Sequence, residues 1–231
     1  METISLGLVW YAVFLFSIVF HEFAHSLMSF KLGDSTAFHA GQVTLDPIPH
    51  IKRELFGTTI VPIISYAISG WMIGWASAPY DPHWAYDNPK KSAWVSFAGP
   101  LANLGLVIIT MIIIRLGIFI GFFISPDTLN FTNIVESANG GVLSAFALFL
   151  SILFSLNVML FLFNLLPIPP LDGSGMIPFF VNEEKSRHFM EIMYNSPIRY
   201  VGLFIAWKLF DAIYPPFHFL IVNILYPGMY S

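Results

Sequence analysis

Long runs of hydrophobic residues, separated by short polar stretches, dominate this chain. Three of the runs, at residues 4–31, 92–124 and 141–166, are long enough to cross a bilayer, because a helix needs about 20 apolar residues to span roughly 30 Å of hydrocarbon. The first run is expected to end near Lys31, since a basic residue in the last turn with Gly33 just beyond it is typical of a helix C-terminus. The pattern predicts three core transmembrane helices.

The connection between the first two spans follows a different pattern. Residues 36–58 mix polar and apolar positions, and alternation with β-branched residues at 42–45 predicts a short strand that stops at Asp46 and Pro47. We expect this segment to lie at the membrane surface.

Residues 58–78 are apolar but are interrupted by Pro62, Gly70 and Gly74. We predict a re-entrant hairpin, half helix and half strand, that returns to the side of the membrane from which it came. Non-helical backbone at that depth is stable only where it is buried in protein or lines a cavity.

The C-terminal part carries two shorter apolar segments, about 199–213 and 217–228, with Pro215 and Pro216 between them. They predict one or two extra C-terminal helices. A polar loop is expected at 125–140, between the second and third spans.

The composition agrees with a polytopic membrane protein, since 56% of the 231 residues are hydrophobic and only 10% are charged. The predicted fold is an all-α polytopic membrane protein. It is expected to form one domain over residues 1–231, with a core at about 4–178 and accessory helices at about 199–228. No basic run indicates nucleic-acid binding. The absence of cysteine leaves His and carboxylate side chains as metal ligands.

The sequence His21-Glu22-Phe23-Ala24-His25 places ionisable residues inside the first apolar run, where each is costly unless it has a function. On a helix, residues four apart are offset by only about 40°, so both imidazoles face the same way and can bind Zn²⁺ from one side. Glu22 lies about 100° round the helix, where it can reach a metal-bound water but not the metal. This is the arrangement of a general base in a zinc hydrolase.

A catalytic zinc site needs a third protein ligand and an open position. Asp172 is the strongest candidate, because it follows the third span and is set by a proline-rich turn at the same end of the membrane as His25. The other aspartates considered lie in loops with no comparable constraint: Asp46, Asp81 and Asp87.

Basic residues predict the orientation of the chain. If 58–78 is re-entrant, most of them fall on one side of the membrane: Lys31, Lys52, Arg53, Lys90, Lys91, Lys185, Arg187 and Arg199. Arg115, which is able to snorkel outward, and Lys208 are the exceptions. The positive-inside rule makes that side the cytoplasm, so the N-terminus is expected outside and the zinc site toward the cytoplasmic face.

The residues Asn164 to Gly173 read N-x-x-P-x-x-P-x-D-G, and together with the HExxH sequence they resemble the site-2 protease family of intramembrane zinc metalloproteases. The small-residue sequence Ala98-Gly99-Pro100-x-x-Asn103 is also similar. The resemblance is to the compact prokaryotic members without a PDZ or CBS domain. It implies that His21, His25 and Asp172 bind one Zn²⁺ per chain and that Glu22 is the catalytic base.

The resemblance implies hydrolysis of peptide bonds in or near transmembrane segments of membrane-protein substrates, in the cell membrane of a prokaryote. A helix hides its peptide bonds, so the substrate must unwind, and an exposed strand edge at 41–46 or 72–78 could pair with it by β-addition. The bilayer and a transmembrane substrate are then the expected partners, and the sequence leaves a homo-oligomer open.

Several roles stay open at this point. Asn164 and Asn103 could each donate to the scissile carbonyl or the oxyanion, or could instead form a hydrogen bond between helices. His39 and His50 flank the surface segment, where they could support the metal site or gate it, or could be ordinary surface residues.

Two functions from other classes fit the sequence less well than a protease does. A metal transporter also places His and Asp inside helices, but it needs a polar path on both sides, and residues 6–20 are almost wholly apolar. An inactive relative that only holds substrate would have no use for the intact His21, Glu22, His25 and Asp172.

Overall fold

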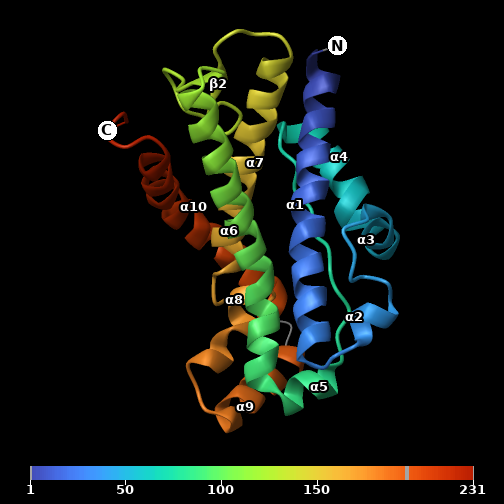
Figure 1. The fold of residues 1–231 in the computed structure, drawn as a ribbon. Coiled ribbons are helices and arrows are strands. Elements are labelled where there is room, and N and C mark those ends of the chain that lie inside the picture. The colour runs from blue at the N-terminus through green and yellow to red at the C-terminus, as the bar shows by residue number, and fades with distance from the viewer. Residues whose placement is uncertain (1, 196–197, 231) are drawn as a thin grey trace.

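The computed structural model describes residues 2–195 and 198–230. Three long helices stand side by side and form the centre of the molecule (Figure 1): α1 (Glu2–Leu32), α6 (Pro89–Phe119) and α7 (Val142–Asn164). Each is long and apolar enough to cross a membrane, and α7 is the most buried of them. The predicted three spans are confirmed, and the chain is an integral membrane protein.

Small residues let the central helices approach closely. Ala98, Gly99 and Pro100 of α6 are buried where this helix packs against α1. A proline inside a helix removes one backbone hydrogen bond, which a helix in a membrane bundle tolerates because neighbouring groups compensate. The ends of α1 and α6 that meet at this contact therefore lie close enough for side chains on both to share one site.

Five short helices connect α1 to α6: α2 (Thr36–His39), α3 (Pro47–Arg53), the π-helical turn η1 (Phe56–Ile60), α4 (Val61–Ser69) and α5 (Pro82–Asp87). The strand predicted at 42–45 is wrong, because this stretch is an irregular loop that leads into α3. The Asp46 carboxylate accepts a hydrogen bond from the backbone N–H of Ile48 and so caps α3, and Pro47 occupies its first turn. These helix-start signals outweigh the short alternation before them.

The hairpin predicted at 58–78 consists of a helix followed by a return. The apolar helix Phe56–Ser69 is too short to cross a bilayer, at about 1.5 Å per residue. After Gly70 the chain runs back along α1 to α5 without a helix (Figure 1). The half-strand prediction needs correction, since residues 72–80 pair with no second strand in the described part of the chain.

The connection between α6 and α7, predicted as a polar loop, holds two short antiparallel strands, β1 (Phe123–Ile124) and β2 (Glu136–Ser137). Ser151 on α7 fixes the loop, because its hydroxyl accepts hydrogen bonds from the N–H groups of Ile134 and Val135 at 2.9 and 3.2 Å.

After α7 come α8 (Asp172–Gly175), the 3₁₀ turn η2 (Ile177–Phe179), α9 (Glu183–Asn195) and α10 (Ile198–Leu225). Of the one or two C-terminal helices predicted here, the structure has one, since α10 continues through Pro215 and Pro216. The fixed φ of proline suits a helix, so the cost is two lost hydrogen bonds rather than a break. Arg115 donates to the carbonyl oxygen of Leu225 at 3.0 Å and so caps the end of α10.

Asp34 joins the end of α1 to the loop before α5. Its carboxylate is almost fully buried and accepts hydrogen bonds from the Ser29 hydroxyl and from the N–H groups of Thr36 and Asp81, at 2.9–3.0 Å. Burial alone would raise the pKa of Asp34, but these hydrogen bonds outweigh it and hold the pKa below its usual range. The ionised carboxylate is therefore the form that stabilises this corner.

We expect Asp34→Asn to lower the stability of the protein in detergent by about 1–3 kcal/mol at pH 7, because the amide cannot accept all three bonds. A group with a lowered folded-state pKa contributes stability above its ordinary pKa, and this contribution is lost as the pH falls through the folded pKa. The difference in melting temperature between Asp34→Asn and wild type should therefore shrink in strong acid. Asp127→Asn, at an exposed carboxylate, is the control. An equal difference at all pH values would contradict the assignment.

Candidate metal centre

Two imidazoles of α1 form the first part of the site. His21 and His25 are four residues apart on one face of the helix, and their Nε2 atoms lie 3.0 Å from each other. Both histidines are largely buried: the exposed fraction of His21 is 7% and that of His25 is 9%. The predicted HExxH geometry on a helix is thus present.

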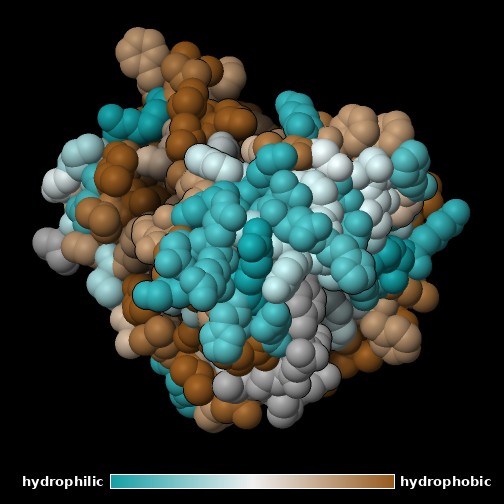
Figure 2. All heavy atoms as spheres, turned by 90° about the horizontal axis from the view of Figure 1, so that it is seen from below, coloured by the Kyte–Doolittle hydropathy of each residue, from teal (hydrophilic) through white to brown (hydrophobic). Residues whose placement is uncertain are grey.

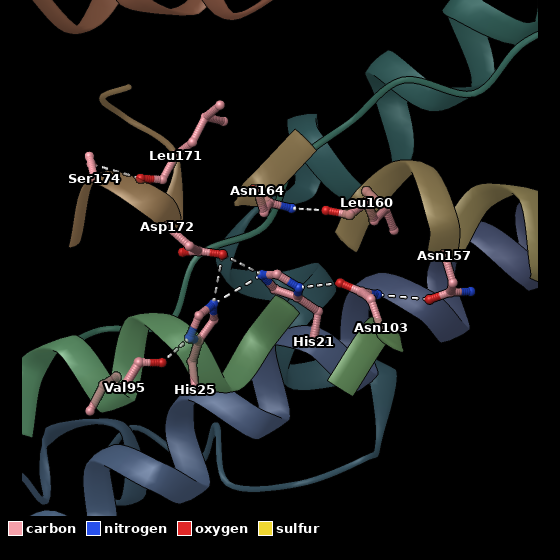
Figure 3. Close-up of polar contacts among 10 residues, drawn as sticks. All are labelled: His21, His25, Val95, Asn103, Asn157, Leu160, Asn164, Leu171, Asp172 and Ser174. Carbon is pink, nitrogen blue, oxygen red and sulfur yellow. Dashed lines mark hydrogen bonds and ion pairs between the residues drawn. The ribbon is translucent and has the colours of Figure 1, made fainter. Parts of the chain in front are cut away.

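Asp172, about 150 residues after His25 in the sequence, provides the third donor atom. It begins α8, directly after the proline-rich turn that follows α7, and its Oδ2 atom lies 3.1 Å from Nε2 of His21 and 3.3 Å from Nε2 of His25 (Figure 3). A Cβ on the next residue, Gly173, would lie only 2.3–2.4 Å from the carbonyl oxygens of Leu165 and Leu166. Glycine at 173 therefore allows the turn to fold tightly against the end of α7 and to hold Asp172 over α1.

The three donor atoms fit a zinc ion. Two imidazole nitrogens and one carboxylate oxygen are a usual protein donor set for catalytic zinc, and bonds of about 2 Å in a tetrahedron place ligand atoms roughly 3.3 Å apart. The observed separations of 3.0, 3.1 and 3.3 Å match this spacing. His21, His25 and Asp172 therefore form a candidate metal site.

Gly99 of α6 keeps space open beside these donors. A Cβ at this position would lie 2.3 Å from Nε2 of His25 and 2.5 Å from Nε2 of His21, closer than any real contact. The sequence indicated only that small residues here allow close helix packing. The structure shows that the helix backbone itself forms one wall of the candidate metal site.

The other nitrogen of each imidazole faces α6. Nδ1 of His21 lies 2.6 Å from Oδ1 of Asn103, and Nδ1 of His25 lies 2.7 Å from the carbonyl oxygen of Val95. Such partners orient metal-binding imidazoles and raise their basicity. Both Nε2 atoms are consequently directed toward Asp172.

The side chain of Asn103 is fully buried and also donates to Oδ1 of Asn157 on α7 at 2.8 Å. Of the two roles that the sequence left open for Asn103, the contacts are those of a hydrogen bond between helices. Asn164, at the end of α7, donates to the carbonyl oxygen of Leu160 in its own helix at 3.0 Å. It is partly buried, and in Figure 3 its amide is drawn with its hydrogen bond to Leu160.

A cavity of about 420 Å³ opens beside the candidate metal site. Its lining includes Glu22, His25 and Asp172, the irregular chain from Ala76 to Tyr80, and Phe189 and Met190 of α9. Glu22 is 6% exposed and is not one of the three clustered donors. Glu22 therefore lines the same cavity as His25 and Asp172 but is not one of the three candidate metal ligands.

His39 and His50 lie outside this cluster. His39 is exposed and packs edge-on against Phe38. His50 is buried in α3, with Nε2 lying 3.0 Å from the carbonyl oxygen of Thr44. These contacts place both residues in the surface segment and give neither a direct link to the candidate metal site.

Sequence reasoning missed two groups, Asn157 and the carbonyl of Val95. Asn157 did carry a signal, because an amide in the middle of a 23-residue apolar helix is costly unless it has partners. A backbone carbonyl carries no such signal.

A His–His–Asp cluster with a neighbouring carboxylate, opening on a cavity among membrane-spanning helices, defines a membrane-embedded metallohydrolase. The model of "Peptidase family M50" matches residues 9–209, which is most of the chain. The chain therefore belongs to peptidase family M50, the site-2 protease family, and is a zinc metalloprotease by this membership.

Individual relatives agree with this assignment. The chain is 31% identical to the proposed zinc metalloprotease YwhC of Bacillus subtilis, over 87% of this chain and 90% of YwhC. It is 28% identical to the proposed zinc metalloproteases Rip2 of Mycolicibacterium smegmatis and of Mycobacterium tuberculosis strain H37Rv. These alignments cover 76% and 84% of this chain and 58% and 66% of the two Rip2 proteins. No solved structure matches the chain.

Proposed function

We propose that this protein hydrolyses peptide bonds in or near transmembrane segments of membrane proteins, with one Zn²⁺ held by His21, His25 and Asp172. The observation that carries the proposal is the three-donor cluster beside a cavity that Glu22 lines together with His25 and Asp172. When bound, zinc supplies a Lewis acid that polarises the substrate carbonyl and lowers the pKa of water toward 7.

Two side chains of the protein, Glu22 and Asn164, carry out the proton transfer and the stabilisation of the reacting carbonyl. Glu22 accepts the proton of the attacking water and passes it to the leaving amine. The Asn164 amide donates one N–H to the carbonyl oxygen of Leu160. Its second N–H can donate to the scissile carbonyl or to the oxyanion.

We further propose that the zinc site lies toward the cytoplasmic side of a prokaryotic cell membrane. Hydrophilic side chains gather on the end of the molecule where α1 finishes and α6 begins, while hydrophobic atoms cover its flanks (Figure 2). Basic residues at this end belong to the last turn of α1, the first turn of α6, and α9: Lys31, Lys90, Lys91, Lys185 and Arg187. The positive-inside rule favours the cytoplasm for this end.

The irregular chain beside the cavity offers an edge on which a substrate can be held. Every second residue bonds to the helices before it: the Ile73 N–H to Oγ of Ser65 at 3.0 Å, the Trp75 N–H to the oxygen of Gly57 at 3.1 Å, and the Ser77 oxygen to Nε of Arg53 at 2.9 Å. In an extended chain, alternate residues direct their backbone groups to opposite sides. One edge of the segment is therefore occupied.

Ala76 and Ala78 lie on the opposite edge and line the cavity. Within residues 2–195 and 198–230, the N–H groups of these two alanines make no hydrogen bond to the protein. We propose that an unwound substrate pairs with this edge by β-addition, which would present an extended peptide to the site.

Replacing Ala76 by proline is expected to reduce cleavage of a membrane-protein substrate at least about 10-fold, because proline removes the free-edge N–H and one backbone hydrogen bond is worth roughly 1.4 kcal/mol in a transition state. Zinc content should not change. Ala76→Ser retains the N–H and should cleave at the wild-type rate. Undiminished cleavage by Ala76→Pro would rule out pairing at this edge.

The proposed function is tested by incubating purified protein in detergent with a panel of single-span model substrates. We expect cleavage that stops when a zinc chelator is added and returns when zinc is restored. Zinc-loaded protein that cleaves no substrate in the panel would instead favour a metal-holding or transport role.

A further inference from the structure

We infer that Asn157, in the middle of α7, is a positioning residue that acts through Asn103 to determine which nitrogen of His21 carries a proton. The inference rests on the proposed function to the extent that it treats His21 as a zinc ligand. It concerns a residue to which the proposed mechanism gives no part.

A chain of hydrogen bonds joins Asn157 to the metal centre across three helices (Figure 3). The Asn157 amide on α7 receives a hydrogen bond from Asn103 on α6 at 2.8 Å, and Asn103 lies 2.6 Å from Nδ1 of His21 on α1. The amide nitrogen of Asn157 also donates to the carbonyl oxygen of Leu153 at 2.8 Å and to the Ser17 hydroxyl at 2.9 Å. The side chain of Asn157 thus has a partner on each side.

The carbonyl oxygen of Leu153 sets the donor and acceptor direction of these hydrogen bonds. The carbonyl oxygen of Leu153 can only accept, so the Asn157 amide must turn its NH₂ group toward it and its oxygen toward Asn103. Asn103 must then donate through its own NH₂ and turn its oxygen toward His21. Because that oxygen can only accept, Nδ1 of His21 must carry the proton.

This polarity leaves Nε2 of His21, the atom that faces Asp172 and His25, available as a ligand. An asparagine amide can rotate by about 180° with little change in shape. If Asn103 did so, its NH₂ would face Nδ1, which would then accept a hydrogen bond and favour a proton on Nε2. A proton there competes directly with a metal ion.

His25 provides an internal comparison. Its Nδ1 faces the carbonyl oxygen of Val95, which cannot change its polarity. A backbone acceptor therefore fixes the tautomer of His25 directly. His21 has a reversible amide in the same position, and only the second amide, Asn157, removes the ambiguity.

The burial of the hydrogen-bonded side chains also argues for a function. Ser17, Asn103 and Asn157 are each 0% exposed, in the part of the bundle where an idle polar group costs several kcal/mol. The amide hydrogens of Asn157 are both used and its oxygen is used once. A buried polar network in which the nitrogen and the oxygen of both amides have partners is well suited to define one geometry.

The first experiment measures zinc affinity by competition with a chelating dye, using purified protein in detergent. Asn157→Leu, which has a similar volume and no acceptor, should weaken zinc binding by about 10–100-fold. Asn157→Asp, protonated in this buried position, keeps an oxygen acceptor toward Asn103 and an O–H donor toward the Leu153 carbonyl oxygen, so it should stay much nearer to wild type. Thr110→Val is the matched control, since Thr110 is a fully buried polar residue of α6 whose hydroxyl, among the described residues, bonds to Leu106 of its own helix alone.

The second experiment uses ¹⁵N-histidine NMR of the metal-free protein, and the wild-type spectrum alone can overturn the inference. Nδ1 of His21 should carry a proton in wild type, and this preference should be lost in Asn157→Leu. A neutral wild-type His21 with its proton on Nε2 would overturn the inference, even if the variant failed to fold.

A double-mutant cycle separates a relay from independent packing effects. Asn103→Leu together with Asn157→Leu should bind zinc no more weakly than Asn103→Leu alone, because the second change interrupts a chain already broken. Fully additive losses would overturn the inference. Wild-type protein that binds zinc with the expected tautomer but cleaves nothing would refute the proposed function and leave the relay in place.

Discussion

Substitution of Glu22 by glutamine is expected to reduce cleavage of model transmembrane substrates by about 10²–10⁴-fold and to leave zinc binding intact. Glutamine has the volume of glutamate but cannot take a proton from water. Glu22 lines the cavity beside His25 and Asp172 and is not one of the three clustered donors, so its loss should not release the metal. Cleavage rate and zinc content, measured on the same preparation, test both halves of the prediction.

Glu136→Gln is a suitable control, because Glu136 lies in β2, toward the opposite end of the central helices from α8 (Figure 1), and accepts a hydrogen bond from Asn133. It should cleave at the wild-type rate. Equal cleavage by Glu22→Gln and wild type would mean that Glu22 is not the base, and loss of zinc from Glu22→Gln would place it among the ligands.

Substitution of Gly99 by alanine is expected to remove zinc binding, lowering affinity by more than about 100-fold. The added methyl group would lie 2.3 and 2.5 Å from the two imidazole Nε2 atoms, so at least one imidazole must move away from Asp172. The zinc content of purified Gly99→Ala, measured by elemental analysis, checks this result.

Gly105 supplies the matched control on the same helix, since a Cβ there would meet no atom within 4 Å. Gly105→Ala should retain full zinc content and slightly favour the helix, because alanine has the higher helix propensity. Wild-type zinc content in Gly99→Ala would show that the donors do not occupy the positions described above.

The long helices were predictable from the sequence because each is specified many times over. Some 20 or more apolar residues agree on each span, and no other structure satisfies their backbone in a membrane. The short segments depend on few residues, so one competing signal decides them. At 42–45 the cap formed by Asp46 outweighed a four-residue alternation, and at Pro215 and Pro216 the tolerance of an apolar helix outweighed two prolines.

The candidate site was predictable to the extent that its residues are adjacent in sequence or follow a recognisable turn. His21 and His25 are fixed by one helical turn, and Asp172 by its place after the third span. The roles of Asn103 and Asn157 depend on how α6 and α7 are rotated about their axes. That rotation arises from the packing of all three helices together, and no local pattern encodes it.

The distance along the chain between the donors affects biosynthesis. The two histidines enter the membrane with the first span, but Asp172 follows His25 by about 150 residues and is made after all three spans. At about 5–20 residues per second, a ribosome needs roughly 7–30 s to reach it. A nascent chain therefore has an incomplete set of the proposed zinc ligands while it is being inserted, so we expect a newly made protease to become competent only after its last core helix is in place.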